Sequence, residues 1–93
     1  MHTRYELKPP LPIIFSLSVL LSPVPEIHWK KLDGPMPPNH EVAGSHLHLY
    51  NVQFEDGGTY QCEAVNSRGK DYHTARVSVE GKKYVVYDVS LVL

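Results

Sequence analysis

Cysteine and histidine offer the most chemistry in this chain, because thiolate and imidazole groups act as metal ligands, nucleophiles and bases. The sequence has one cysteine, Cys62, and six histidines. His46 and His48 lie two residues apart and would share one face of a strand, but no third ligand follows at a spacing typical of a metal site. We also find no nucleophile–base–orienter set, no glycine-rich phosphate loop and no paired carboxylates. We therefore expect no enzyme, no cofactor and no metal site.

The stretch that leads to Cys62 reads Asp56-Gly-Gly-Thr-Tyr-Gln-Cys62 and predicts a tight turn followed by a strand. Glycine adopts the backbone angles that a tight turn needs. Tyr60 and Cys62 are two residues apart, so they would point to the same face of the strand. If that face is buried, Cys62 is an inert core thiol. The alternative is that the unpaired thiol forms a disulfide with another molecule in an oxidising compartment.

Three further segments alternate apolar and polar side chains, which is the period of a half-buried strand. They cover residues 26–31 with Ile27 and Trp29 on the inner face, residues 45–50 with Leu47 and Leu49, and residues 71–80 with Ala75, Val77 and Val79. The segment 36–44 contains too much proline for a central strand, so we expect only a brief strand there.

These features together are typical of an immunoglobulin-like sandwich. In that fold a tyrosine stands two residues before the second core cysteine, and a tryptophan on an earlier strand packs against the inter-sheet disulfide. Ninety-three residues suit one such domain. We predict an all-β fold, an antiparallel β-sandwich of the intermediate immunoglobulin set, with strands C to G in residues 23–80. Its structural core contains Trp29, Leu49, Tyr60 and Cys62.

Residues 1–22 allow two interpretations. Basic residues precede the apolar run 11–21, as in a short signal peptide, although no good cleavage site follows. Alternatively, Phe15, Leu17 and Val19 alternate with serines, as in a half-buried strand. We favour the strand.

Residues 23–80 resemble an immunoglobulin domain of the contactin family of neural cell-adhesion molecules. The matching words are Pro-Val-Pro-Glu-Ile-His-Trp-Lys-Lys (23–31), Leu-Asp-Gly-Pro-Met-Pro (32–37), Leu-His-Leu-Tyr-Asn-Val (47–52) and Phe-Glu-Asp-Gly-Gly-Thr-Tyr-Gln-Cys-Glu-Ala-Val-Asn-Ser-Arg-Gly-Lys-Asp (54–71). The Asp-x-Gly-x-Tyr-x-Cys core is common to many immunoglobulin domains, whereas the words after Cys62, together with Trp-Lys-Lys-Leu-Asp-Gly, favour contactins over muscle or kinase relatives. Related domains often pair Asp56 with a basic residue near strand D, where this chain has only His40.

The chain departs from the family upstream of Pro23. The resemblance implies a first core cysteine about a dozen residues before the strand C tryptophan, and here that position falls near Leu17. We therefore expect strands A and B to be replaced or incomplete, with Phe15, Leu17 and Val19 in place of strand B and no inter-sheet disulfide. A disulfide that closes a loop of roughly 45 residues contributes about 4 kcal/mol, so we expect a marginally stable sandwich.

We divide the chain into a non-family N-terminal segment (1–22), an immunoglobulin-like domain (23–80) and a non-family apolar tail (81–93). We expect a truncated or alternatively spliced product of a larger protein. The β-prone tail could extend the last strand, pair with the edge of another chain or stay exposed. We favour an extension of the last strand.

Composition excludes several classes of partner. A formal net charge of -1 gives no electrostatic footprint for nucleic acid or an anionic membrane, and no pattern indicates a small-molecule substrate. The contactin resemblance implies a cell-surface adhesion module in axon guidance, with homophilic or heterophilic adhesion proteins as partners. It also implies an extracellular location and a membrane-anchored parent protein. The alternatives are a structural spacer repeat that binds nothing and an intracellular muscle-type repeat, which would explain the lone cysteine.

Overall fold

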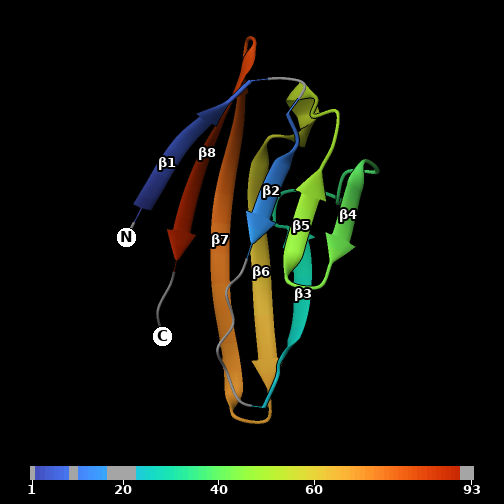
Figure 1. Cartoon of the computed structure of the whole chain (residues 1–93), viewed down its shortest axis with the longest axis vertical. Helices are drawn as coiled ribbons and strands as arrows, with labels where there is room; N and C mark the ends of the chain where they lie inside the picture. Colours follow the sequence, from blue (N-terminus) through green and yellow to red (C-terminus); the bar gives the residue numbers. More distant parts are fainter. Residues whose placement is uncertain (1, 9–10, 17–22, 91–93) are drawn as a thin grey trace.

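The computed structural model describes residues 2–8, 11–16 and 23–90 of the chain. In these residues it has eight strands and one short 3-10 turn. They are β1 (His2–Leu7), β2 (Ile13–Ser16), β3 (Glu26–Lys31), β4 (His40–Ala43), β5 (His46–Leu49), η1 (Phe54–Asp56), β6 (Gly58–Asn66), β7 (Gly69–Glu80) and β8 (Lys83–Ser90). The strands form two antiparallel sheets that face each other in an elongated sandwich, 43 × 27 × 21 Å along its principal axes (Figure 1).

The order of the strands identifies the fold. The five-stranded sheet has the order β1-β8-β7-β6-β3, and the three-stranded sheet has the order β2-β5-β4. An immunoglobulin sandwich places strands C, F and G in one sheet and strands B, E and D in the other. The neighbours β3-β6-β7 and β2-β5-β4 reproduce these two groups, so that β3 to β7 are strands C to G and β2 stands in the place of strand B. The prediction of an immunoglobulin-like antiparallel sandwich is confirmed.

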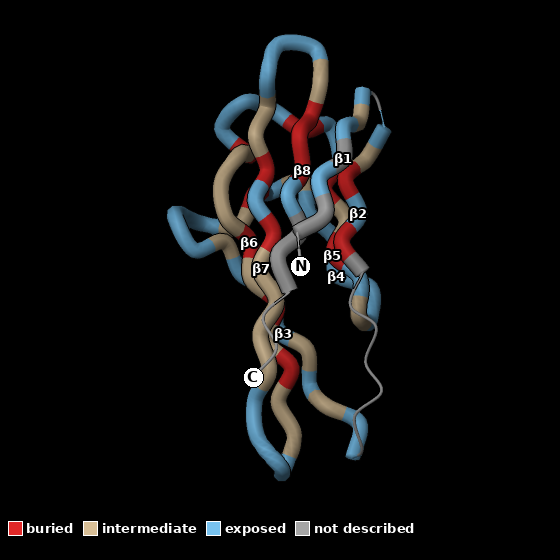
Figure 2. The backbone as a smooth tube through the Cα atoms, turned by 90° about the vertical axis from the view of Figure 1, so that its left-hand side faces the viewer, coloured by how far each residue is buried: buried red, intermediate tan, exposed pale blue. Residues whose placement is uncertain are grey.

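Strands β3, β5, β6 and β7 form where the sequence alternates, because a period of two turns every second side chain into the core. β3 covers the predicted residues and pairs with β6 so that Trp29 lies opposite Cys62. The proline-rich segment gives only the four-residue β4, whose residues are all exposed. The buried segments are red in Figure 2. The main core cluster consists of Ile13, Phe15, Leu47, Leu49, Val52, Tyr60, Ala75, Val77, Tyr84 and Val86.

We expected the C-terminal tail to extend the last strand, and this prediction is wrong. The tail folds back on β7 instead. The chain reverses between Glu80 and Lys83, where Gly81 adopts a φ of +61°, and β8 then runs antiparallel to β7. This hairpin buries Tyr84 and Val86, which are 4% and 0% exposed. A simple extension of β7 would leave such side chains in water, so the hydrophobic effect favours the hairpin.

Two segments upstream of Pro23 also join the sandwich. β1 pairs with the outer edge of β8, and β2 pairs with β5. Within β2, Ile13 and Phe15 are buried in the core. Leu17 and Val19, which we predicted to continue this strand, lie outside the described residues. The division of the chain after residues 22 and 80 stays a prediction.

Candidate functional site

The corner that precedes β6 is built around Tyr60. Its side chain is 0% exposed, and its hydroxyl donates a hydrogen bond to the backbone carbonyl of Asp56 at 2.5 Å. Burial raises the pKa of the Tyr60 phenol, and the carboxylates of Asp56 and Asp33 raise it further. The hydroxyl therefore keeps its proton and remains a donor. This is the tyrosine corner that the fold requires.

The carboxylate of Asp56 holds the same corner from the other side. It is 5% exposed and accepts hydrogen bonds from the backbone N–H of Gln53 at 2.8 Å and from the side-chain amide of Asn39 at 3.2 Å. His40, the basic residue available near strand D, bonds to the carbonyl of Pro37 instead. An amide thus replaces the basic partner, and sequence reasoning missed it because Asn39 lies in a proline-rich loop.

A second set of polar contacts ties the end of β3 to the start of β6. Lys31 donates to the carboxylate of Asp33 at 3.1 Å, and the backbone N–H of Thr59 lies 3.3 Å from the same carboxylate. The Lys31 ammonium group, helped by the Thr59 N–H, holds the pKa of Asp33 below its ordinary value. Gly58 is required here, because its φ is +143° and a Cβ atom would lie 2.6 Å from Asp33 Oδ1.

The predicted core residues lie between the sheets, but not equally deep. Leu49 is fully buried, whereas Trp29 is half-buried and its indole N–H has no hydrogen-bond partner among the residues that the structure describes. The ring of Phe15 stacks on Trp29 with centroids 6.3 Å apart and lies 5.8 Å from the ring of Tyr60. Phe15 thus covers the tryptophan that packs against the disulfide in antibody domains. The alternation of Phe15 with the serines predicts a half-buried strand but carries no information about this contact.

Cys62 is a free thiol with 0% exposure. It clusters with Ala64, and Ile27 and Trp29 pack against the pair. Burial, and then the charge of Asp71, raise the pKa of the thiol to about 11. Such a thiol is a poor nucleophile, which supports the interpretation of Cys62 as an inert core residue. Leu17, which we predicted to lie opposite it, is outside the described residues.

The outward face of the five-stranded sheet carries mostly polar and charged side chains. Two open hollows lie on it. The larger, about 390 Å³, is lined by Arg76, Ser78, Glu80 and Tyr87, and the smaller, about 80 Å³, by His28, Lys30, Gln61 and Glu63. Ligand pockets are usually concave and mostly apolar, so these polar hollows suit contact with a protein surface better than binding of a small molecule.

The histidines of β5 form a polar row on the other sheet. The rings of His46 and His48 lie 6.3 Å apart, and Nδ1 of His48 is 2.8 Å from the hydroxyl of Tyr50. No group of three or more His, Cys, Asp or Glu side chains that could hold a metal ion occurs among the described residues. No helix in this part of the chain is long and apolar enough to cross a membrane.

Comparison with known proteins shows which family this chain belongs to. The sequence profile of the immunoglobulin I-set domain matches residues 5–79. The chain is 54% identical over 63 residues to Contactin-1a of Danio rerio, 49% identical over 61 residues to Contactin-1 of Homo sapiens and 44% identical over 61 residues to Contactin-2 of Rattus norvegicus. These matches cover 64%, 63% and 66% of this chain.

The chain spans about 6% of the length of each of these relatives. The matches bear out the resemblance to contactins that the sequence words predicted. The profile match covers most of the chain, and it agrees with the strand order, the tyrosine corner and the tryptophan of β3. The chain therefore belongs to the immunoglobulin I-set domain family.

Proposed function

We propose that this chain is a contactin-like immunoglobulin adhesion module that binds another protein at the cell surface. The observation that carries the proposal is the 54% identity over 63 residues to Contactin-1a. The chain spans only about 6% of the length of that relative. We therefore also propose, as what the family resemblance implies, a role in adhesion and axon guidance, an extracellular location and a membrane-anchored parent protein.

The chemistry of the surface supports a protein partner. The outward face of the five-stranded sheet offers charged and hydrogen-bonding groups around two open hollows, one lined by Arg76 and Tyr87 among others and one by His28 and Lys30 among others. Arginine and tyrosine are enriched in protein interfaces. We propose no catalytic role, because the one thiol is buried with a raised pKa.

The proposal is tested by binding to cells. Beads that carry the 93-residue chain are incubated with cultured neurons and with non-neural cells, and bound beads are counted with and without excess soluble chain. We expect saturable binding to neurons that the soluble chain abolishes. If a chain shown to be folded by circular dichroism binds neither cell type, the adhesion proposal fails and the spacer repeat takes its place.

Two finer expectations have tests of their own. Secretion of the chain from transfected cells would exclude the intracellular muscle-type repeat, and retention in the cytosol would contradict the surface location. The expectation of a truncated or alternatively spliced product stays a prediction. Transcript reads that cross codons 20–25 and 78–83 within one gene would support it, and their absence would count against it.

A further inference from the structure

β3 forms one edge of the five-stranded sheet. Among the described residues it pairs with β6 alone. Just past β3, the backbone N–H of Leu32 donates to the carbonyl of Thr59 on β6 at 2.8 Å. Hydrogen-bonded pairs alternate along an antiparallel ladder, so every second residue before Leu32 also faces β6, and His28 is one of these. The backbone groups of Ile27 and Trp29 therefore face away from β6. A strand with outward backbone groups is a template for another strand.

The sequence of β3, Glu-Ile-His-Trp-Lys-Lys, is complementary to itself when read antiparallel. With a twofold axis at His28, Glu26 of one copy lies opposite Lys30 of the other, and Lys30 opposite Glu26. In the same register Ile27 lies opposite Trp29, so that the outward backbone groups of the two strands meet. The register therefore satisfies charge, apolar contact and backbone pairing together.

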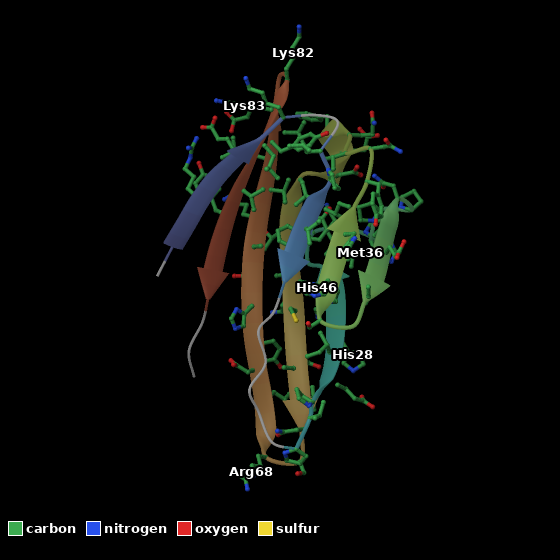
Figure 3. All side chains as sticks on the ribbon, in the orientation of Figure 1. His28, Met36, His46, Arg68, Lys82 and Lys83 are labelled. Atoms are coloured by element: carbon green, nitrogen blue, oxygen red, sulfur yellow. The ribbon has the colours of Figure 1, made fainter. Side chains whose placement is uncertain are left out.

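We propose that the edge of β3 is a homophilic pairing surface, on which a second copy of this chain docks antiparallel with His28 on the twofold axis. Figure 3 shows His28 on β3, at the outer edge of the sheet. The side chains that meet are accessible, since Glu26 and His28 are 83% and 60% exposed. The half-buried Ile27 and Trp29 would become more covered in the pair. The inference rests on the proposed function, because it names the partner and surface of the adhesion module.

The pairing should be weak when only this edge contributes. Two six-residue strands bury much less than the roughly 1,600 Å² of a standard interface, so the dimer should appear only at high protein concentration. Weak pairing suits modules displayed in many copies on a surface, where avidity raises the overall affinity. Sedimentation equilibrium over a wide range of concentration measures the dimerisation constant directly.

Charge reversal tests the proposed register. Glu26→Lys alone, or Lys30→Glu alone, puts like charges opposite each other twice per dimer, and each should weaken dimerisation at least about fivefold. The double variant Glu26→Lys with Lys30→Glu restores the opposite pairs and should restore the dimer. Lys70→Glu makes the same change in charge as Lys30→Glu, but on an exposed part of β7, and should leave the dimer unchanged.

Cross-linking tests the position of the axis. In the proposed pair, residue 28 faces its own counterpart in a non-hydrogen-bonded position with Cα atoms about 4.5 Å apart, within reach of a disulfide. His28→Cys should therefore form a covalent dimer under mild oxidation. Lys30→Cys should not, because its counterpart lies about 13 Å away along the strand. Cys62 is buried and stays in both variants.

A chain that remains monomeric at millimolar concentration would overturn the inference and would show that the charges of β3 protect its edge. Dimerisation that ignores the charge reversals, or cross-linking of both cysteine variants, would also overturn it. These results are independent of the bead assay. Binding of neurons by a strictly monomeric chain would leave the adhesion proposal intact, and dimerisation without binding of cells would leave the edge pairing intact.

Discussion

Tyr60 stabilises the corner before β6 because its hydroxyl and the carbonyl of Asp56 satisfy each other where water cannot reach. The bond is buried, and the residue that carries the carbonyl is only 5% exposed. Removing the donor leaves a buried acceptor unsatisfied, which costs more than a hydrogen bond at the surface. The hydroxyl oxygen of Tyr60 therefore contributes to the stability of the corner, beside the hydrogen bonds of the Asp56 carboxylate.

Tyr60→Phe removes that oxygen and keeps the ring. We expect it to lower the free energy of unfolding by about 1–2 kcal/mol, measured by urea unfolding followed by circular dichroism. Tyr87→Phe is the matched control, because the Tyr87 hydroxyl accepts an exposed hydrogen bond from Arg4 at 3.3 Å. The control should change stability by less than about 0.5 kcal/mol. Equal losses in the two variants would contradict this account of the corner.

The thiol of Cys62 should be unreactive in the folded chain. Burial, with the charge of Asp71, raises its pKa to about 11 from the ordinary 9.0, so the thiolate is scarce at pH 8. We expect Ellman's reagent to react at least about a hundredfold more slowly with the native chain than with the urea-unfolded chain. Because folding raises the pKa of the thiol, its protonated form contributes to the free energy of unfolding. This contribution is fully present below pH 9 and is lost as the pH rises through about 11. Equal rates in the native and unfolded chains would show an exposed thiol.

Among the strands, those with a clear alternation could be predicted. The residues of β3 agree with the predicted range because Ile27 and Trp29 alternate with polar neighbours, and because a turn follows at Asp33 and Gly34. The prediction that the tail extends β7 is wrong, because β8 pairs with β7 in a hairpin. Gly81, which lies between two β-prone runs, is a signal for such a hairpin. The sequence of β1 gives no comparable pattern, and its strand depends on the edge that β8 provides.

The polar contacts of the site were harder to predict than the strands. The tyrosine corner follows from local spacing, because Tyr60 and Asp56 are four residues apart. The bond from Asn39 to Asp56 joins residues that are 17 positions apart and depends on how the proline-rich loop folds. The contact of Phe15 with Trp29 joins two sheets. Sequence patterns of a single strand carry no information on such pairs.

β8 should act as part of the core and not as a loose tail. Val86 is 0% exposed and lies opposite Val77 in the register of β7 and β8. We expect Val86→Ala to lower the free energy of unfolding by about 2 kcal/mol, because two methyl groups leave the core and a cavity remains. Val42→Ala, at a residue that is 48% exposed on β4, should cost much less. Thermal unfolding of both variants tests this, and a silent Val86→Ala would mean that the tail does not pack as a strand.

At the scale of the whole molecule, the sandwich lacks the covalent link that joins the two sheets in antibody domains. The described residues contain no disulfide, and a disulfide at this position would stabilise the fold by about 4 kcal/mol. Small domains have only about 5–15 kcal/mol in total. The two sheets are therefore held together by apolar contacts, and Phe15 is central to them, because it meets both Trp29 and Tyr60 from the opposite sheet.

Phe15→Ala should therefore threaten the whole fold and not only β2. Truncating a buried phenylalanine typically costs about 3–5 kcal/mol, which is a large part of the stability available. We expect the melting temperature to fall by at least about 12 °C, or the cooperative transition to disappear, in thermal unfolding followed by circular dichroism. Phe54→Ala makes the same substitution at a residue that is 79% exposed and should leave the transition nearly unchanged. If the two variants melted alike, the contacts of Phe15 would not hold the two sheets together.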